Sequence, residues 1–116
     1  MNLRPENRRI EIAGEDAIEV LRVIEVILIS LHKIGACYAV PVNREMTETE
    51  KRDYEQETNR FIDGWKVTSR LSKARRLLSE CFDLTLGEDD MDDVERALES
   101  VDFWSGPGSS PPGQTP

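Results

Sequence analysis

The residues with the clearest chemical potential are the basic side chains that follow Gly64. No acidic residue lies between Gly64 and Ser79, and this stretch contains five cations: Lys66, Arg70, Lys73, Arg75 and Arg76. At helical spacing Lys66, Arg70 and Lys73 share one face. Cations gathered on one helical face can contact phosphates, as they do in helices that bind nucleic acid. One hypothesis is therefore a small nucleic-acid-linked regulator that binds phosphates with these five residues.

An acidic group follows the basic residues after a short loop. Its carboxylates are Glu88, Asp89, Asp90, Asp92, Asp93 and Glu95. An antiparallel neighbouring helix would bring them to the basic residues, and such internal pairing is the more ordinary interpretation of both groups. Counted from Asp83, a calcium-binding EF-hand loop would place Val94 where a bidentate carboxylate is required, so that motif fails. We expect no bound metal and no cofactor.

Pairs of carboxylates spaced three residues apart occur at Glu45/Glu48, Asp89/Asp92 and Asp92/Glu95. In helical nucleotide pyrophosphohydrolases this spacing lines a magnesium site, so a metal-dependent nucleotide hydrolase is a further hypothesis. Here the pairs lie at expected helix beginnings, where the helix dipole alone favours acidic residues. His32 is the only histidine, and Cys37 and Cys81 match no ligand or redox spacing. We therefore expect no enzyme, and two reduced cysteines that pack as small core residues.

The overall charge favours a basic protein partner. Twenty-three acidic and fifteen basic side chains give a net charge of −8, which disfavours general binding to nucleic acid or anionic lipid. The leading hypothesis is a non-enzymatic interaction module, such as an inhibitor, an immunity-type protein, a chaperone or an adaptor. The predicted partner-binding residues are Glu48, Glu50, Asp53, Glu57, Asp89, Asp90, Asp92, Asp93 and Trp104.

The most apolar element that must position these residues is a helix predicted over residues 15–34. It contains the consecutive residues Val26, Ile27, Leu28 and Ile29. A surface helix needs only one apolar stripe, so this helix should be covered from several sides. Three helices can hardly enclose it, and we predict that residues 17–34 also form a homo-oligomer.

Two further helices are predicted. Thr47 and Glu50 have the spacing of a capping box, which begins a long second helix that bends near Gly64. A third helix is predicted over residues 88–102 from its regular apolar stripe. The aromatic residues Tyr54, Phe61, Trp65, Phe103 and Trp104 are expected to hold the ends of this bundle to the first helix.

The predicted fold is an all-α bundle of three main helices. Residues 1–13 are an irregular lead-in, residues 14–104 are one helical domain, and the Pro/Gly/Ser-rich residues 105–116 are a disordered tail. A minor two-stranded pairing of residues 10–12 with residues 36–42 is an open alternative. The polar start of the chain and the charges within its apolar segment lead us to expect a cytoplasmic protein without a membrane span.

Overall fold

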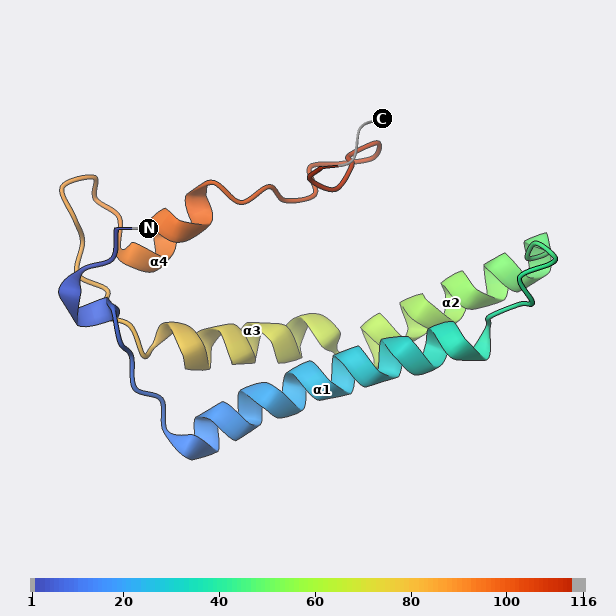
Figure 1. Cartoon of the computed structure of the whole chain (residues 1–116), viewed down its shortest axis with the longest axis horizontal. Helices are drawn as coiled ribbons and strands as arrows, with labels where there is room; N and C mark the ends of the chain where they lie inside the picture. Colours follow the sequence, from blue (N-terminus) through green and yellow to red (C-terminus); the bar gives the residue numbers. More distant parts are fainter. Residues whose placement is uncertain (1, 114–116) are drawn as a thin grey trace. The chain divides into compact units, whose positions relative to one another are not determined.

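The computed structural model describes residues 2–113, and all of its regular elements are helical (Figure 1). They are the 3-10 turn Pro5–Asn7 and the helices α1 (Gly14–Cys37), α2 (Glu48–Gly64), α3 (Val67–Ser79) and α4 (Asp93–Glu99). The all-α prediction is confirmed. The alternative β pairing is not supported, since residues 2–113 contain no strand. An isolated strand pair is marginal without a surface to pack on, and Pro41 lacks a backbone donor.

The described chain forms two compact units. Residues 11–80 contain α1, α2 and α3, and the second unit combines residues 2–10 with residues 81–113. The predicted domain of residues 14–104 spans parts of both units. The predicted tail lies in the second unit, and its residues 114–116 fall outside the described part of the chain.

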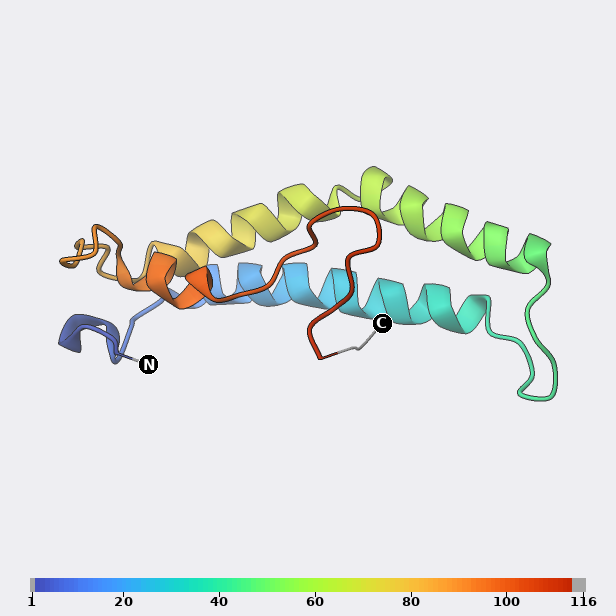
Figure 2. The same cartoon turned by 90° about the horizontal axis from the view of Figure 1, so that it is seen from above.

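In the first unit, α2 and α3 follow one another along the same side of α1 (Figures 1 and 2). The buried centre of this unit is small: Val20 and Val23 of α1 pack with Ala74 of α3, and the half-buried Ile27 and Leu77 lie against them. Because two helices in succession can cover only one side of a third, the opposite side of α1 stays open. The prediction that α1 is covered from several sides is therefore wrong within this unit.

The start of α2 follows the predicted capping box. The Thr47 hydroxyl accepts a hydrogen bond from the Glu50 N–H at 3.1 Å, and the Glu50 carboxylate accepts one from the Thr47 N–H at 2.9 Å. Arg44 adds two hydrogen bonds to the same carboxylate, at 2.8 and 2.9 Å. The Arg44 guanidinium and the Thr47 N–H lower the pKa of Glu50 to about 2. The capping prediction is confirmed, and Glu50 is thereby committed to a local structural role.

Replacing the capping hydroxyl gives a direct test of this helix start. Thr47→Ala removes the acceptor for the Glu50 N–H, and we expect it to lower the free energy of unfolding by about 1 kcal/mol. Urea unfolding followed by circular dichroism measures the change. Thr49→Ala is the matched control, since Thr49 lies inside the helix and has no capping hydrogen bond among the described residues. Equal losses in the two variants would contradict the capping role.

The predicted long, bent helix is instead two separate helices. Between them lie Trp65 and Lys66, and Lys66 adopts a left-handed backbone conformation with φ = 53°. A residue in this conformation cannot continue a right-handed helix, so the chain turns sharply there rather than bending smoothly. The Arg70 side chain fixes the turn because its Nε donates to the Trp65 carbonyl oxygen at 2.8 Å.

The predicted aromatic contacts form only in part. Phe61 is buried and lies against Trp65 with ring centroids 5.7 Å apart, and Tyr38 stacks on Tyr54 at 5.8 Å. Phe103 and Trp104, in contrast, are 72% and 73% exposed, so they do not close the end of a bundle. They follow a helix that ends at Glu99, and no regular element carries them back to an apolar surface.

The last helix is shorter than the predicted range of residues 88–102. It begins only at Asp93 because residues 87–91 form a turn, in which the Met91 carbonyl accepts from the Gly87 N–H at 2.9 Å. Asp90 is left-handed in this turn, with φ = 60°. The Asp92 side chain then accepts from the Glu95 N–H at 2.8 Å and caps α4. The acidic residues predicted to form the first turn of a helix therefore lie in two places: Asp89 and Asp90 in the turn of residues 87–91, and Asp92 at the cap of α4.

Candidate functional site

One candidate site is a group of large aliphatic side chains on α1 that remain partly exposed. We call it the exposed face of α1, and its members are 42–57% exposed: Ile18, Leu21, Ile24, Leu28, Ile29 and Leu31. Four of them, from Leu21 to Leu31, recur at intervals of three and four residues. This is the spacing of the a and d positions in a helix that pairs with another helix.

The size of the exposed face of α1 sets it apart from scattered surface leucines. Six half-exposed aliphatic side chains present on the order of 500 Å² of apolar area, which is near the upper end for a soluble monomer. Patches of this size are often functional. The face lies within residues 17–34, the segment predicted from sequence to support self-association.

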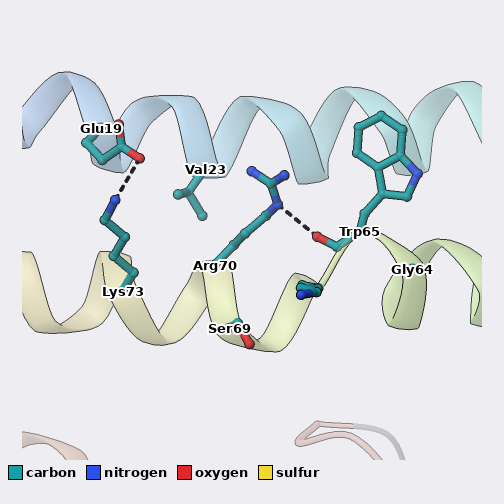
Figure 3. Close-up of a pocket in the computed structure, with 8 residues that line it drawn as sticks. Glu19, Val23, Gly64, Trp65, Ser69, Arg70 and Lys73 are labelled. Carbon is teal, nitrogen blue, oxygen red and sulfur yellow. Dashed lines mark hydrogen bonds and ion pairs between the residues drawn. The ribbon is translucent and has the colours of Figure 1, made fainter.

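A second candidate site is a pocket between α1 and the junction of α2 with α3 (Figure 3). Its volume is about 570 Å³, and we call it the Lys66 pocket. It is lined by Glu19 and Val23 from α1, Gly64, Trp65 and Lys66 from the junction, and Ser69, Arg70 and Lys73 from α3. Three of the five cations predicted as phosphate ligands thus line one pocket, whereas Arg75 and Arg76 are not among its lining residues.

Within the Lys66 pocket the charges are unequally paired. The Lys73 ammonium lies 3.3 Å from a Glu19 carboxylate oxygen, whereas Arg70 donates its Nε to a neutral carbonyl (Figure 3). In residues 2–113 no carboxylate forms an ion pair with Lys66 or Arg70. The predicted partners of the basic residues were the acids after Gly87, but Lys73 pairs with α1 instead. The pocket keeps two cations without a neutralising carboxylate.

The predicted acidic contact residues of the second unit have mostly internal roles. Asp93 is 3% exposed, and its carboxylate accepts from the Arg4 N–H at 2.7 Å, the Asn7 side-chain amide at 2.8 Å and Arg96 at 2.8 Å. Arg96 also donates to both carboxylate oxygens of Asp89, at 2.7 and 2.8 Å. We call this set of residues, 4, 7, 83, 89, 93 and 96, the polar clasp.

Asn7 is one of the residues of the polar clasp that sequence reasoning missed. It is 3% exposed, and besides its bond to Asp93 its side chain exchanges two hydrogen bonds with the Asp83 backbone, at 2.7 and 2.9 Å. These contacts join positions more than 70 residues apart in the chain. A single Asn in a polar segment carries no periodic or local signal, so nothing in the sequence marked it.

Hydrogen bonds lower the pKa values of acidic residues in the polar clasp and of Asp92 beside it. The Asn7 amide, the Arg4 N–H and the Arg96 guanidinium hold the pKa of Asp93 below its usual value. The Arg96 guanidinium does the same for the pKa of Asp89, and the N–H of Glu95 lowers the pKa of Asp92. Of the predicted contact residues in this unit, Asp89, Asp90 and Trp104 are exposed, and Asp89 is paired with Arg96.

The predicted contact residues on α2 are closer to the surface. Asp53 is exposed, while Glu48 and Glu57 make ion pairs with residues three positions further along the helix, Lys51 at 3.6 Å and Arg60 at 3.1 Å. Ion pairs of this kind on an exposed helix are weak, since water and salt screen them. These carboxylates can therefore exchange partners, unlike Glu50 in the capping box.

Other chemical groups are placed as follows. Cys37 is exposed, so the prediction that it packs in a core is wrong, because it lies in the last turn of α1 beyond the region covered by α3; Cys81 is half-buried. The structure contains no disulfide between these two cysteines. Within residues 2–113 no three His, Cys, Asp or Glu side chains lie close enough together to hold a metal ion.

Comparison of the chain with protein-family models, curated proteins and solved structures found no match. In the described part of the chain, no helix combines the length and the apolar character that crossing a membrane requires.

Proposed function

We propose that this protein is a non-enzymatic helical interaction module that works as a dimer of two identical chains. The observation that carries the proposal is the exposed face of α1, whose six aliphatic side chains stay 42–57% exposed while α2 and α3 pack on the same helix. Two such faces in contact would bury roughly the 1,000 Å² that separates a biological interface from an incidental one. A symmetric dimer also uses the same patch twice, which a continuous row of Leu and Ile permits.

The charges along α1 support an antiparallel arrangement of the two copies. The first half of the helix, residues 14–25, has four carboxylates and one arginine, whereas residues 26–37 have Lys33 and His32 and no carboxylate. A parallel pair would place the acidic halves together, and like charges at close range oppose association. An antiparallel pair places each acidic half beside the other copy's basic half and also opposes the two helix dipoles favourably.

The dimer leaves the acidic surface of α2 available for a basic protein partner. Asp53 is exposed, and the weak surface ion pairs of Glu48 and Glu57 can yield to a basic residue of that partner. A net charge of −8 on each chain would accelerate encounter with such a partner at low salt. This part of the proposal follows from charge, while the dimer follows from the exposed face of α1.

Measuring the molecular mass of the full chain over a range of concentrations tests the dimer. We expect light scattering after size exclusion to give twice the chain mass of 13.2 kDa at tens of micromolar, as for interfaces of this size, and a fall towards one chain mass on dilution. A mass of one chain at every concentration would contradict the proposal. A mass that keeps increasing with concentration would also contradict it, because a two-fold interface closes at two copies.

A further inference from the structure

We propose that the Lys66 pocket binds a mononucleotide, with its phosphates on Lys66 and Arg70 and its base on Trp65. This site is distinct from the exposed face of α1, because Glu19 and Val23 line the pocket from the packing side of α1 (Figure 3). The inference therefore does not depend on the proposed dimer.

The lining of the Lys66 pocket is locally basic. It contains three cations, Lys66, Arg70 and Lys73, and one carboxylate, Glu19, in a chain whose net charge is −8. Elsewhere in residues 2–113, six cations pair with a carboxylate within 4 Å, namely Arg4, Arg22, Arg44, Lys51, Arg60 and Arg96, and six do not: Arg8, Arg9, Lys33, Arg52, Arg75 and Arg76. What distinguishes Lys66 and Arg70 is that both line one pocket, where two cations without a carboxylate partner form a local site for an anion.

The geometry of Arg70 suits a phosphate group. Its Nε is bonded to the Trp65 carbonyl at 2.8 Å, which orients the guanidinium. The two terminal nitrogens of an arginine held in this way remain for a bidentate contact with two oxygens of one phosphate. In Figure 3 these nitrogens extend from α3 towards α1.

The backbone of Lys66 is left-handed. With φ = 53°, Lys66 occupies a left-handed region that glycine adopts at much lower cost. The nearby Gly64, two positions earlier, is not the residue that takes this conformation. A lysine retained at a strained position beside a pocket is consistent with a role for its side chain there. The strain also makes Lys66→Gly informative, because this variant should increase stability while it weakens binding.

Trp65 and the pocket volume define the ligand class. The indole is 55% exposed at the pocket while also touching Phe61, so a planar ring can stack on it. A volume of about 570 Å³ is in the range of small-molecule sites and accommodates one nucleotide. A longer polyanion would in addition meet the repulsion of the acidic surface.

Binding of ADP to the full chain tests the site. Isothermal titration calorimetry measures the affinity, and the Trp104→Phe variant makes Trp65 the only tryptophan, so that its fluorescence reports ligand at the pocket. We expect a saturable heat signal and a saturable change of Trp65 fluorescence with the same midpoint. The absence of both signals at millimolar ADP would overturn the proposal.

Three variants locate the binding. Arg70→Gln and Lys66→Gly should each weaken ADP binding about tenfold, the usual effect of losing one charge-assisted hydrogen bond. Lys66→Gly should at the same time raise the thermal unfolding midpoint, because glycine relieves the left-handed backbone. Arg75→Gln removes the same charge from α3 outside the pocket lining and should change the affinity less than about twofold. An equal loss in Arg75→Gln and Arg70→Gln would overturn the assignment to the pocket.

Two further probes define the ligand. Inorganic phosphate should bind at least about tenfold more weakly than ADP, because it gains no stacking on Trp65. Equal affinity would overturn the contact with the base. A short oligodeoxythymidylate should bind no more tightly than ADP, and tighter binding would overturn the free mononucleotide in favour of single-stranded nucleic acid.

Discussion

Leu28→Glu is expected to convert the proposed dimer into monomers and to raise its dissociation constant at least about a hundredfold. Leu28 is the most exposed member of the exposed face of α1, at 57%, and it lies at the middle of the row. In the dimer a glutamate there would lose its water within an apolar contact, and twofold symmetry would repeat the penalty on the other copy. Sedimentation velocity over a range of concentrations measures the change.

The matched control is the same substitution on another helix. Leu71 of α3 is 48% exposed but lies outside the exposed face of α1, so Leu71→Glu should leave the dissociation constant within about threefold of the original. Both variants should retain their helical circular dichroism, since neither side chain belongs to the buried centre of the unit. If Leu71→Glu dissociated the dimer as strongly as Leu28→Glu, the contact would lie elsewhere.

The elements that sequence reasoning located correctly are those set by local interactions. The capping box at Thr47 needs only residues within one turn, so its spacing is visible in the sequence. The apolar segment of α1 was equally visible as a helix. Its burial was not, because the same row of Ile and Leu can face the chain's own helices or a second copy. The composition of α1 indicated that its apolar residues should be covered, but not whether the same chain or a second molecule covers them.

The features that sequence reasoning missed depend on contacts between distant residues or on one backbone angle. Gly64 indicated a break, yet the sharp turn occurs at Lys66, and a lysine gives no sign that it will be left-handed. The face shared by Lys66, Arg70 and Lys73 was visible from helical spacing, but the pocket also required Glu19, some 50 residues earlier. The run of acids after Gly87 resembled a solvated helix start, and only the folded clasp shows that Asp93 is buried.

Asp93→Asn is expected to break the hydrogen bonds of the polar clasp and so to detach α4 from residues 2–10. One Asp93 carboxylate oxygen accepts from both Arg4 and Asn7, and the other accepts from Arg96. An asparagine has only one acceptor oxygen, so its NH₂ group must face donors on one side, and a buried unsatisfied donor is costly. We expect the Arg4 amide proton, which binds Asp93 directly, to exchange at least about tenfold faster in hydrogen-exchange NMR.

The same carboxylate should make the clasp sensitive to acid. Because the pKa of Asp93 is lower when folded, its stabilising contribution is complete above the unfolded value of about 3.9 and is lost as pH falls through the folded pKa. Exchange of the Arg4 amide, corrected for intrinsic rates, should therefore accelerate below about pH 3.9 in the original chain. In Asp93→Asn this acid-dependent acceleration should be much smaller. Asp83, Asp89 and Asp92, whose pKa values are also lowered, should supply what remains.

Asp90→Asn separates the hydrogen bonds of Asp93 from the mere loss of one negative charge. Asp90 lies three residues before Asp93, is exposed, and has the left-handed φ of 60° that asparagine also accepts. Its replacement removes the same charge, and it should leave the exchange rate of the Arg4 amide within about twofold. If both variants accelerated exchange equally, the clasp would depend on the summed charge of this segment. If neither did, the N-terminal residues would be held by contacts other than Asp93, and the donor geometry around its carboxylate would not stabilise the unit.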